Sequence, residues 1–185
     1  MNRIGTQIIE TERLILRKIR KDDAESMFRN WCADSEVTKY LTWQPHKSVE
    51  ESRIIAAEWA ESYKNAGFYH WAITVKGEAD EPVGTIGAVS ADWEIGRVTV
   101  GYCLSRKLWN NGYMTEALGA VIYYFINKVG ANRVECYHDA KNPRSGAVMK
   151  KCGMKFEGIL RQADRNNTGI CDLCMYSVIK SDFKG

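Results

Sequence analysis

The fold of this chain is determined by one stretch, RVTVGYCLSRKLWNNGYMTEALGAVIYYFINKVGANRVECYH, residues 97–138. Apolar and other side chains alternate over residues 97–104, which predicts a strand. From Met114 the apolar residues recur three and four positions apart, which predicts a helix that ends at Gly130. Residues 133–138 return to a strand pattern. A strand–helix–strand passage of this kind is a right-handed crossover between parallel neighbours.

Shorter patterns on both sides of this stretch complete the domain. Helices are predicted at residues 22–33, at 48–67 and from Asn142 to Gly153, where Pro143 follows the cap. Further strands are predicted at residues 6–19, 69–75, 83–90, 155–162 and 171–179. The order is therefore β-α-α-β-β-β-α-β-α-β-β, a mixed α/β fold with a mostly antiparallel sheet. We expect a single domain over residues 1–185.

Two capping signals add detail to the first helices. Asp22 with Glu25 and Ser48 with Glu51 both have the spacing of a capping box. The second box introduces a helix that is expected to carry its apolar residues on one face, namely Ile55, Trp59, Tyr63 and Ala66.

Composition excludes several classes of protein. The 185 residues carry a net charge of +3 and show no basic stripe, so nucleic acid is not an expected partner. No run of about 18 apolar residues predicts a membrane span, and the charged N-terminus does not resemble a signal peptide. Six cysteines in a chain without such a signal fit the reducing cytoplasm.

One cysteine pair has the spacing CxxC, at Cys171 and Cys174. A structural zinc site needs a second pair of ligands, and a redox motif belongs at a strand–helix junction. This pair lies within a predicted strand, so we expect ordinary thiols and no metal.

The residues between the crossover strand and its helix are the strongest candidate for a ligand site. Open sheets bind ligands beyond the C-terminal ends of parallel strands, which here means directly after Leu104. Unpaired N–H groups at the helix start suit a phosphate, Gly112 permits close backbone approach, and Arg106 and Lys107 add positive charge. The alternative is that Asn111 merely caps the helix. Neither common nucleotide-binding signature is present.

Four stretches together resemble the GNAT superfamily of acyl-CoA-dependent N-acetyltransferases, in particular the ribosomal-protein-alanine acetyltransferases. They are TERLILRKIRKDDAESMF, VGYCLSRKLWNNGYMTEAL, NPRSGAVMKKCGMKFEG and RQADRNNTGICDLCMY, in family order over nearly the whole chain. The resemblance implies a sheet whose central parallel strand pair is splayed to admit coenzyme A, with helices on both faces. It also implies acetyl-CoA as the cosubstrate.

The same resemblance assigns the cofactor site. The family loop pattern Q/R-x-x-G-x-G/A, which holds the coenzyme A pyrophosphate, implies a cradle made by Trp109, Asn110, Asn111, Gly112, Tyr113, Met114 and Thr115. Only Gly112 matches the general pattern, and Asn110 and Met114 stand where small residues are usual. The pantetheine arm is implied to bond the strand backbone at Tyr102, Cys103 and Leu104, as an added strand would.

Acetyl transfer to an amine needs a base for the amine and a donor for the departing sulfur. The tyrosine that many family members use as the acid is replaced here by Met149. The subgroup pattern N-x-x-S implies that Asn142 contacts pantetheine and that Ser145 donates toward the thioester sulfur. For Asn142 the alternative is a pure helix cap, and for Ser145 an ordinary first-turn serine.

The resemblance further implies an acidic base in the turn near the end of the chain, where RQADRNNTG supplies Asp164. A solvated turn aspartate is the alternative. The loop between the first two helices is implied to line the acceptor site, with Trp43 and His46 as candidates. His70 and His138 fall in strands and are interpreted as structural.

The leading hypothesis is an N-acetyltransferase that transfers an acetyl group through a tetrahedral intermediate to a primary amine, for example a protein N-terminal α-amine. The alternatives are acetylation of a polyamine, an amino acid or a drug, and a non-catalytic acyl-CoA-binding module. By analogy with relatives, a monomer or homodimer is expected.

Overall fold

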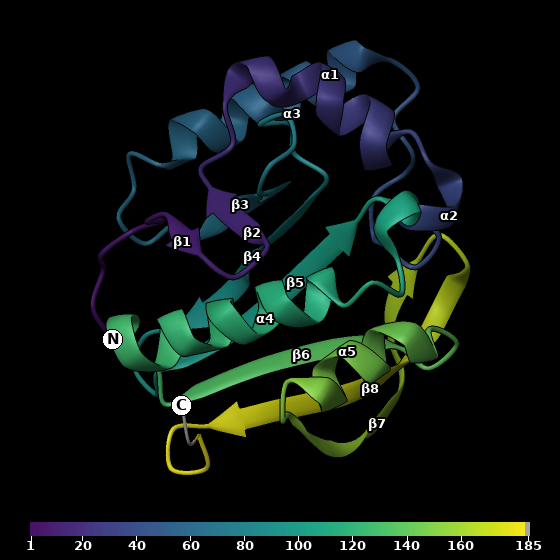
Figure 1. Cartoon of the computed structure of the whole chain (residues 1–185). Coiled ribbons are helices and arrows are strands. Elements are labelled where there is room, and N and C mark those ends of the chain that lie inside the picture. The colour runs from purple at the N-terminus through teal and green to yellow at the C-terminus, as the bar shows by residue number, and fades with distance from the viewer. Residues whose placement is uncertain (184–185) are drawn as a thin grey trace.

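The computed structural model describes residues 1–183 and contains an eight-stranded sheet in the order β1-β2-β3-β4-β5-β6-β8-β7 (Figure 1). Its strands are β1 (Ile9–Glu10), β2 (Leu14–Arg17), β3 (His70–Val75), β4 (Gly84–Asp92), β5 (Arg97–Leu104), β6 (Arg133–Asp139), β7 (Lys155–Asn166) and β8 (Gly169–Ile179). The α-helices are α1 (Ala24–Met27), α2 (Ser35–Thr38), α3 (Val49–Ser62), α4 (Tyr113–Tyr123) and α5 (Pro143–Lys151). Shorter helical segments are η1 (Lys21–Asp23), η2 (Phe28–Cys32), η3 (Arg106–Leu108) and η4 (Tyr124–Val129).

The predicted crossover is confirmed, and it opens the sheet. β5 and β6 are parallel, whereas every other neighbouring pair is antiparallel. Their pairing covers only Arg97–Thr99 opposite Arg133–Glu135, although β5 continues to Leu104 and β6 to Asp139. The two strands therefore diverge toward their C-terminal ends, as the family resemblance implied.

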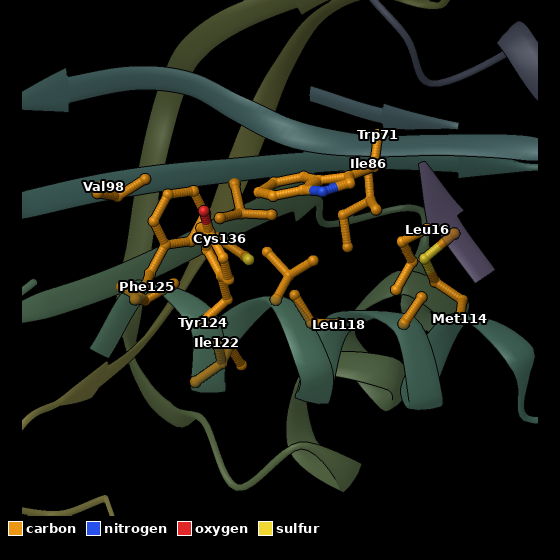
Figure 2. Packing of buried hydrophobic residues seen from close by; sticks show 14 of the residues in the cluster. Leu16, Trp71, Ile86, Val98, Met114, Leu118, Ile122, Tyr124, Phe125 and Cys136 are labelled. Carbon is orange, nitrogen blue, oxygen red and sulfur yellow. The ribbon is translucent and has the colours of Figure 1, made fainter. Parts of the chain in front are cut away.

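The main core lies between α4 with η4 and one face of the sheet. Figure 2 shows Met114, Leu118, Ile122 and Phe125 of this helical segment packed against Leu16, Trp71 and Ile86 from the strands. Every apolar position that the sequence placed on the helix is buried, and Gly130 ends the segment in a left-handed conformation. Sequence periodicity therefore predicted this packing correctly.

The segment η1–α1–η2 and helix α3 form the layer that lies away from α4 and α5 in Figure 1. They enclose a second cluster with Ile19, Met27, Trp31, Ala56 and Ala72 at its centre. This layer and the α4 layer place helices on both faces of the sheet.

The start of this segment corrects the first cap prediction. Asp23, rather than Asp22, accepts a hydrogen bond from the backbone N–H of Arg20, at 2.7 Å. Asp23 also forms a buried pair with Arg17, with a shortest N–O distance of 2.7 Å. The sequence pattern therefore located the correct turn, but it named Asp22 instead of Asp23, the aspartate that pairs with the buried guanidinium of Arg17.

Helix α3 departs from its prediction. It ends at Ser62 instead of Gly67, and its fully buried residues are Ser52 and Ala56. The predicted face is only half-buried at Ile55, Trp59 and Tyr63, and Ala66 is exposed. Ile55 and Trp59 border a cavity described below, which explains why no neighbouring side chain covers them fully.

Among residues 1–183, none of the helices is both long enough and apolar enough to cross a bilayer.

Candidate active site

The loop before α4 has the backbone shape of an anion cradle. Gly112 is the N-cap residue with φ 79°, and Asn110 has φ 64°, so two residues occupy the left-handed region. The alternative, a cap by Asn111, does not occur, because Gly112 is the N-cap residue and the Asn111 side-chain amide donates to the Trp109 carbonyl at 3.2 Å. No side chain among residues 1–183 caps α4, which leaves its first N–H groups available to a ligand.

Arg13, from the turn between β1 and β2, braces this loop. Its guanidinium lies 4.4 Å from the Tyr113 ring centre and donates to the Asn111 carbonyl at 3.0 Å. It also pairs with Glu116 in the first turn of α4, at 2.7 Å. Glu116 accepts hydrogen bonds from Thr11 as well, so the helix start is fixed to the N-terminal hairpin.

A cleft of about 490 Å³ lies beside this loop. All the residues that the sequence assigned to the cofactor line it except Asn111, whose groups face Trp109 and Arg13 instead. Asn142 is the N-cap residue of α5, but its side chain makes no capping bond, so its amide is not committed to the helix. The structure therefore brings the loop, the end of β5 and the start of α5 to one cleft.

The charges of the cleft differ from those expected. Its cationic lining residues are Lys39, Lys141, Arg144 and Lys151, against a single acidic residue, Glu36. Of the two cations that the sequence placed there, neither lines the cleft: Arg106 pairs with Asp34 at 3.0 Å, and Lys107 is exposed. Three of the four cations follow β6 in the chain: Lys141 lies in the turn before α5, and Arg144 and Lys151 lie in its first and last turns.

A second cavity, of about 440 Å³, adjoins the cleft. The two share Tyr40, Leu41, Tyr102, Cys103, Asn142 and Ser145. The lining of this second cavity contains Asp139 and Asp164 and neither lysine nor arginine within residues 1–183. We call it the acidic cavity, and the first the cationic cleft.

Ser145 lies at the junction of the two. Its hydroxyl is 2.9 Å from the hydroxyl of Tyr102, which also donates to the Ser145 carbonyl oxygen at 3.1 Å. Burial raises the pKa of Tyr102 well above its usual range, so this phenol stays protonated at neutral pH. The sequence assigned Tyr102 a backbone role only, and its side-chain contact with Ser145 is an addition from the structure.

Asp164 lies in β7, opposite Cys171 of β8, and not in the hairpin turn where the sequence placed it. One carboxylate oxygen accepts from the Arg165 backbone N–H at 2.8 Å. Burial first, and then the charges of Asp139 and Asp164, raise the pKa of the Cys171 thiol, which places both carboxylates near this cysteine.

Asp139 was missed by sequence reasoning. It is 4% exposed and accepts hydrogen bonds from the Lys141 backbone N–H at 2.7 Å and from the Asn166 amide at 2.6 Å. Among the described residues it has no salt-bridge partner. A buried carboxylate with only neutral donors favours a cationic ligand. Asp139 ends β6, and open sheets bind ligands at the carboxyl ends of parallel strands, so its position in the sequence could have identified it as a candidate site residue.

The loop that carries Trp43 and His46 borders the acidic cavity. The His46 ring nitrogen Nδ1 lies 2.7 Å from the Ser52 hydroxyl, and burial lowers the His46 pKa. The β7–β8 hairpin fixes the loop through Asn167, whose amide donates to the carbonyls of Thr38 and Trp43 at 2.9 and 2.8 Å. Sequence reasoning gave no role to Asn167.

The remaining histidines lie in strands, as interpreted, and both border the acidic cavity. The Nε2 atoms of His70 and His138 are buried and have no hydrogen-bond partner among residues 1–183. Burial lowers the pKa of His70 to about 4, so its ring is neutral at pH 7. Met149 is 1% exposed in the core and lines neither cavity.

Comparison with known proteins identifies this architecture. Residues 13–155 match the family model described as an acetyltransferase (GNAT) domain. The chain is 31% identical over 179 residues to a Bacillus licheniformis protein named "Uncharacterized N-acetyltransferase p20", covering 97% of this chain and 99% of that protein.

Solved structures agree with this match. A GNAT-family acetyltransferase from Bacillus anthracis superposes with a TM-score of 0.81 at 26% identity, covering 95% of this chain and 99% of the other. RimL, a ribosomal alpha-N-protein acetyltransferase in complex with coenzyme A, gives a TM-score of 0.83 at 21% identity, covering 95% and 100%. The chain therefore belongs to the GNAT family and is an acetyl-CoA-dependent N-acetyltransferase.

Proposed function

We propose that this enzyme acetylates α-amines, chiefly at protein N-termini, with the cosubstrate in the cationic cleft and the amine in the acidic cavity. The observation that carries this proposal is the junction of two oppositely charged sites at Tyr102 and Ser145. The fold likeness to RimL, an α-N-protein acetyltransferase by name, is consistent with it.

The residues of the cationic cleft fit acetyl-CoA. The uncapped start of α4 and the left-handed loop offer backbone N–H groups to a pyrophosphate, and the lysines and Arg144 add opposite charge. Arg144 lies 5.4 Å from the Trp109 ring centre, which orients both side chains. When bound, acetyl-CoA supplies an acetyl group activated as a thioester.

The diverging part of β5 would hold the reactive end of the cosubstrate. Beyond Thr99 the backbone of β5 has no ladder partner on the β6 side. Backbone N–H and C=O groups on this side of β5 can bond the pantetheine arm, and an N–H can stabilise negative charge that develops on the carbonyl oxygen. The Leu104 carbonyl is not among them, because it accepts a hydrogen bond from Trp109 Nε1 at 2.8 Å. Asn142, at the start of α5, offers its uncommitted amide to the same arm.

The acidic cavity would receive the amine as an ammonium ion. Asp139 attracts the cation, and Asp164, whose second carboxylate oxygen takes no hydrogen bond from the described residues, accepts its proton directly or through a water. The reference pKa of an α-amine is about 8 and that of lysine about 10.4, so an α-amine is deprotonated at a lower energetic cost.

Ser145 would assist the leaving group. As the new C–N bond forms and the C–S bond breaks, the electron pair of the broken bond stays on sulfur. The Ser145 hydroxyl would donate a hydrogen bond to that sulfur, and the Tyr102 hydroxyl, 2.9 Å away, would then turn its single proton from the Ser145 carbonyl oxygen to Ser145 Oγ. The departing thiolate, whose conjugate thiol has a reference pKa of about 8.5, takes up the second proton, which the attacking nitrogen loses as the amide forms.

The direct test is an amine panel with acetyl-CoA, followed by release of free thiol. Peptides with a free N-terminus should be acetylated, and the same peptides with a blocked N-terminus and an internal lysine should react far more slowly. Preferential acetylation of the lysine side chain would contradict the proposal.

A second candidate is acetylation of a small-molecule amine. The aromatic side chains of Trp31, Trp43 and Trp59 around the acidic cavity favour it, because such a cavity can enclose a compact amine. The panel therefore includes aromatic amines and polyamines beside the peptides.

A further inference from the structure

The acidic cavity extends well beyond the place where an amine would meet Ser145. Its remaining lining comes from η2, α3, β3, β4 and β5, and is contributed chiefly by Trp31, Ile55, Trp59, His70, Val89 and Val100. Asp139, Asp164 and Ser145 belong to β6, β7 and α5, so carboxylates and apolar groups come from different elements. The side chains contributed by η2, α3, β3, β4 and β5, with the space that they border, are called the apolar arm below.

Helix α3 turns large apolar side chains toward this arm. Its fully buried residues are the small Ser52 and Ala56, whereas Ile55 and Trp59 remain half-buried and border the cavity. Trp59 packs on His70 with ring centres 4.2 Å apart, which holds its indole in place. Apolar surface that no side chain of the fold covers marks a ligand site.

The charge of the cavity limits what else the amine can carry. Its lining has two aspartates and, within residues 1–183, neither lysine nor arginine. A free carboxylate next to the amine would therefore be brought near like charges without a compensating cation. An amide, as in a peptide or an amino-acid amide, or an amine without a carboxyl group avoids this repulsion.

We propose that the apolar arm selects amines with a bulky apolar group, preferably aromatic, next to the amino nitrogen and with no free carboxylate. This inference rests on the proposed function, because it assumes that the amine enters the acidic cavity. The amine nitrogen lies toward Asp139 and Asp164, and its apolar group lies against Ile55 and Trp59. A cavity of about 440 Å³ would remain largely unfilled by an N-terminal alanine.

The test compares kcat/KM across peptides that differ only in the first residue, which is Ala, Ser, Leu or Phe. The peptides that begin with Leu and Phe should exceed that beginning with Ala by at least about 10-fold, since each buried methylene contributes to discrimination. Equal or higher values for Ala and Ser would overturn the inference and leave the proposed function standing. Turnover of none of the peptides would instead contradict the proposed function.

Three small amines separate the possible sources of this chemistry. Phenylalaninamide and phenethylamine should be acetylated, whereas free phenylalanine should be at least about 10-fold poorer because of its carboxylate. If kcat/KM for phenethylamine equals that for the Phe-starting peptide, the acceptor is a small aromatic amine. If kcat/KM is much higher for the peptide, the acceptor is the N-terminal residue of a protein or peptide. Equal use of phenylalanine and its amide would overturn the charge argument.

A substitution in the arm tests its location. Ile55→Phe should narrow the arm, reduce kcat/KM for the Phe-starting peptide by about 10-fold and spare the Ala-starting peptide, with KM for acetyl-CoA unchanged. Ile54→Phe is the matched control, because Ile54 is the adjacent residue of α3, is 54% exposed and does not line the cavity.

Val89→Phe provides a second variant in case Ile55→Phe does not fold, because Val89 borders the same cavity and is 60% exposed. It should shift the ratio of the two peptides in the same direction. An unchanged ratio in a folded Ile55→Phe or Val89→Phe enzyme would overturn the assignment of the arm.

Discussion

The cationic cleft and the acidic cavity are similar in size, at about 490 and 440 Å³, yet they differ in charge and in origin. The cleft takes its cations from the residue after α2, from the turn between β6 and α5, and from α5 itself, and the start of α4 supplies backbone N–H groups beside it. The cavity takes its carboxylates from the end of β6 and from β7. One fold thus holds a cationic lining and an acidic lining side by side.

The contrast shows what the divergence of β5 and β6 accomplishes. Were the two strands paired to their ends, β6 would occupy the space beside Tyr102 and Cys103, which both sites now share. Because pairing stops after Thr99, the cationic and the acidic lining meet at shared residues, none of which is an acidic residue, a lysine or an arginine. Substitutions in one site should therefore leave the other site's ligand almost unaffected.

The largest expected effect is in the cleft. Gly112→Val should weaken acetyl-CoA binding by at least about 100-fold in a calorimetric titration, because a β-branched residue is strained at φ 79° and shields the backbone N–H groups. The matched control is Gly77→Val, since Gly77 has φ 81° and no atom within 4 Å of an added Cβ. Equal binding by the two variants would remove the loop from the cofactor site.

A smaller loss is expected from the cavity. Asp164→Asn should reduce kcat by about 100-fold, because an amide cannot accept the amine proton, and it should leave acetyl-CoA affinity unchanged. The loss should diminish as pH rises and more of the amine is already neutral. An exposed carboxylate remote from both sites, Asp22→Asn, is the control. If Asp164→Asn retained the wild-type kcat, Asp164 would not be the base and another group would have to accept the proton.

The junction should show coupling between its two hydroxyl groups. Ser145→Ala should reduce kcat by about 10- to 100-fold and Tyr102→Phe by about 10-fold, with KM for acetyl-CoA nearly constant. Because Tyr102 is proposed to act through Ser145, adding Tyr102→Phe to Ser145→Ala should cost little more. Fully additive losses would show that Tyr102 acts independently of the serine.

The smallest expected effect concerns the cleft cations. Arg144→Gln together with Lys151→Gln should raise KM for acetyl-CoA by about 3- to 10-fold at low salt and by less at high salt, because exposed charges are screened. KM for the amine should not change. A rise in the amine KM of the same size would mean that the two sites are not electrostatically separate.

Much of this arrangement could be predicted from the sequence, because it depends on regular patterns. The apolar repeat from Met114 to Val129 predicted the α4 packing, and the crossover placed a ligand site after Leu104. The loop contains the residue types that tolerate positive φ, and the structure has Asn110 at φ 64° and Gly112 at φ 79°. The family resemblance added Asn142 and Ser145 as candidate site residues, and both line the cleft.

The rest depends on contacts between distant segments, which a linear pattern does not contain. Asp139 meets Asn166 across 27 positions of sequence, and Asn167 reaches Thr38 across 129. The periodicity of α3 could not reveal that Ile55 and Trp59 border a cavity, since core and cavity residues share the same spacing. Arg106 is drawn to Asp34, and this pair removed a cation that the sequence assigned to the cleft.

The most direct test of the two-site account is a crystal structure with a bisubstrate analogue, in which coenzyme A is joined through an acetyl bridge to the α-nitrogen of a short peptide. We predict electron density for the pyrophosphate at residues 110–115 and for the peptide nitrogen in the acidic cavity, beside Ser145 and Asp164. Density that places the peptide in the cationic cleft, or the pyrophosphate away from Gly112, would contradict the account.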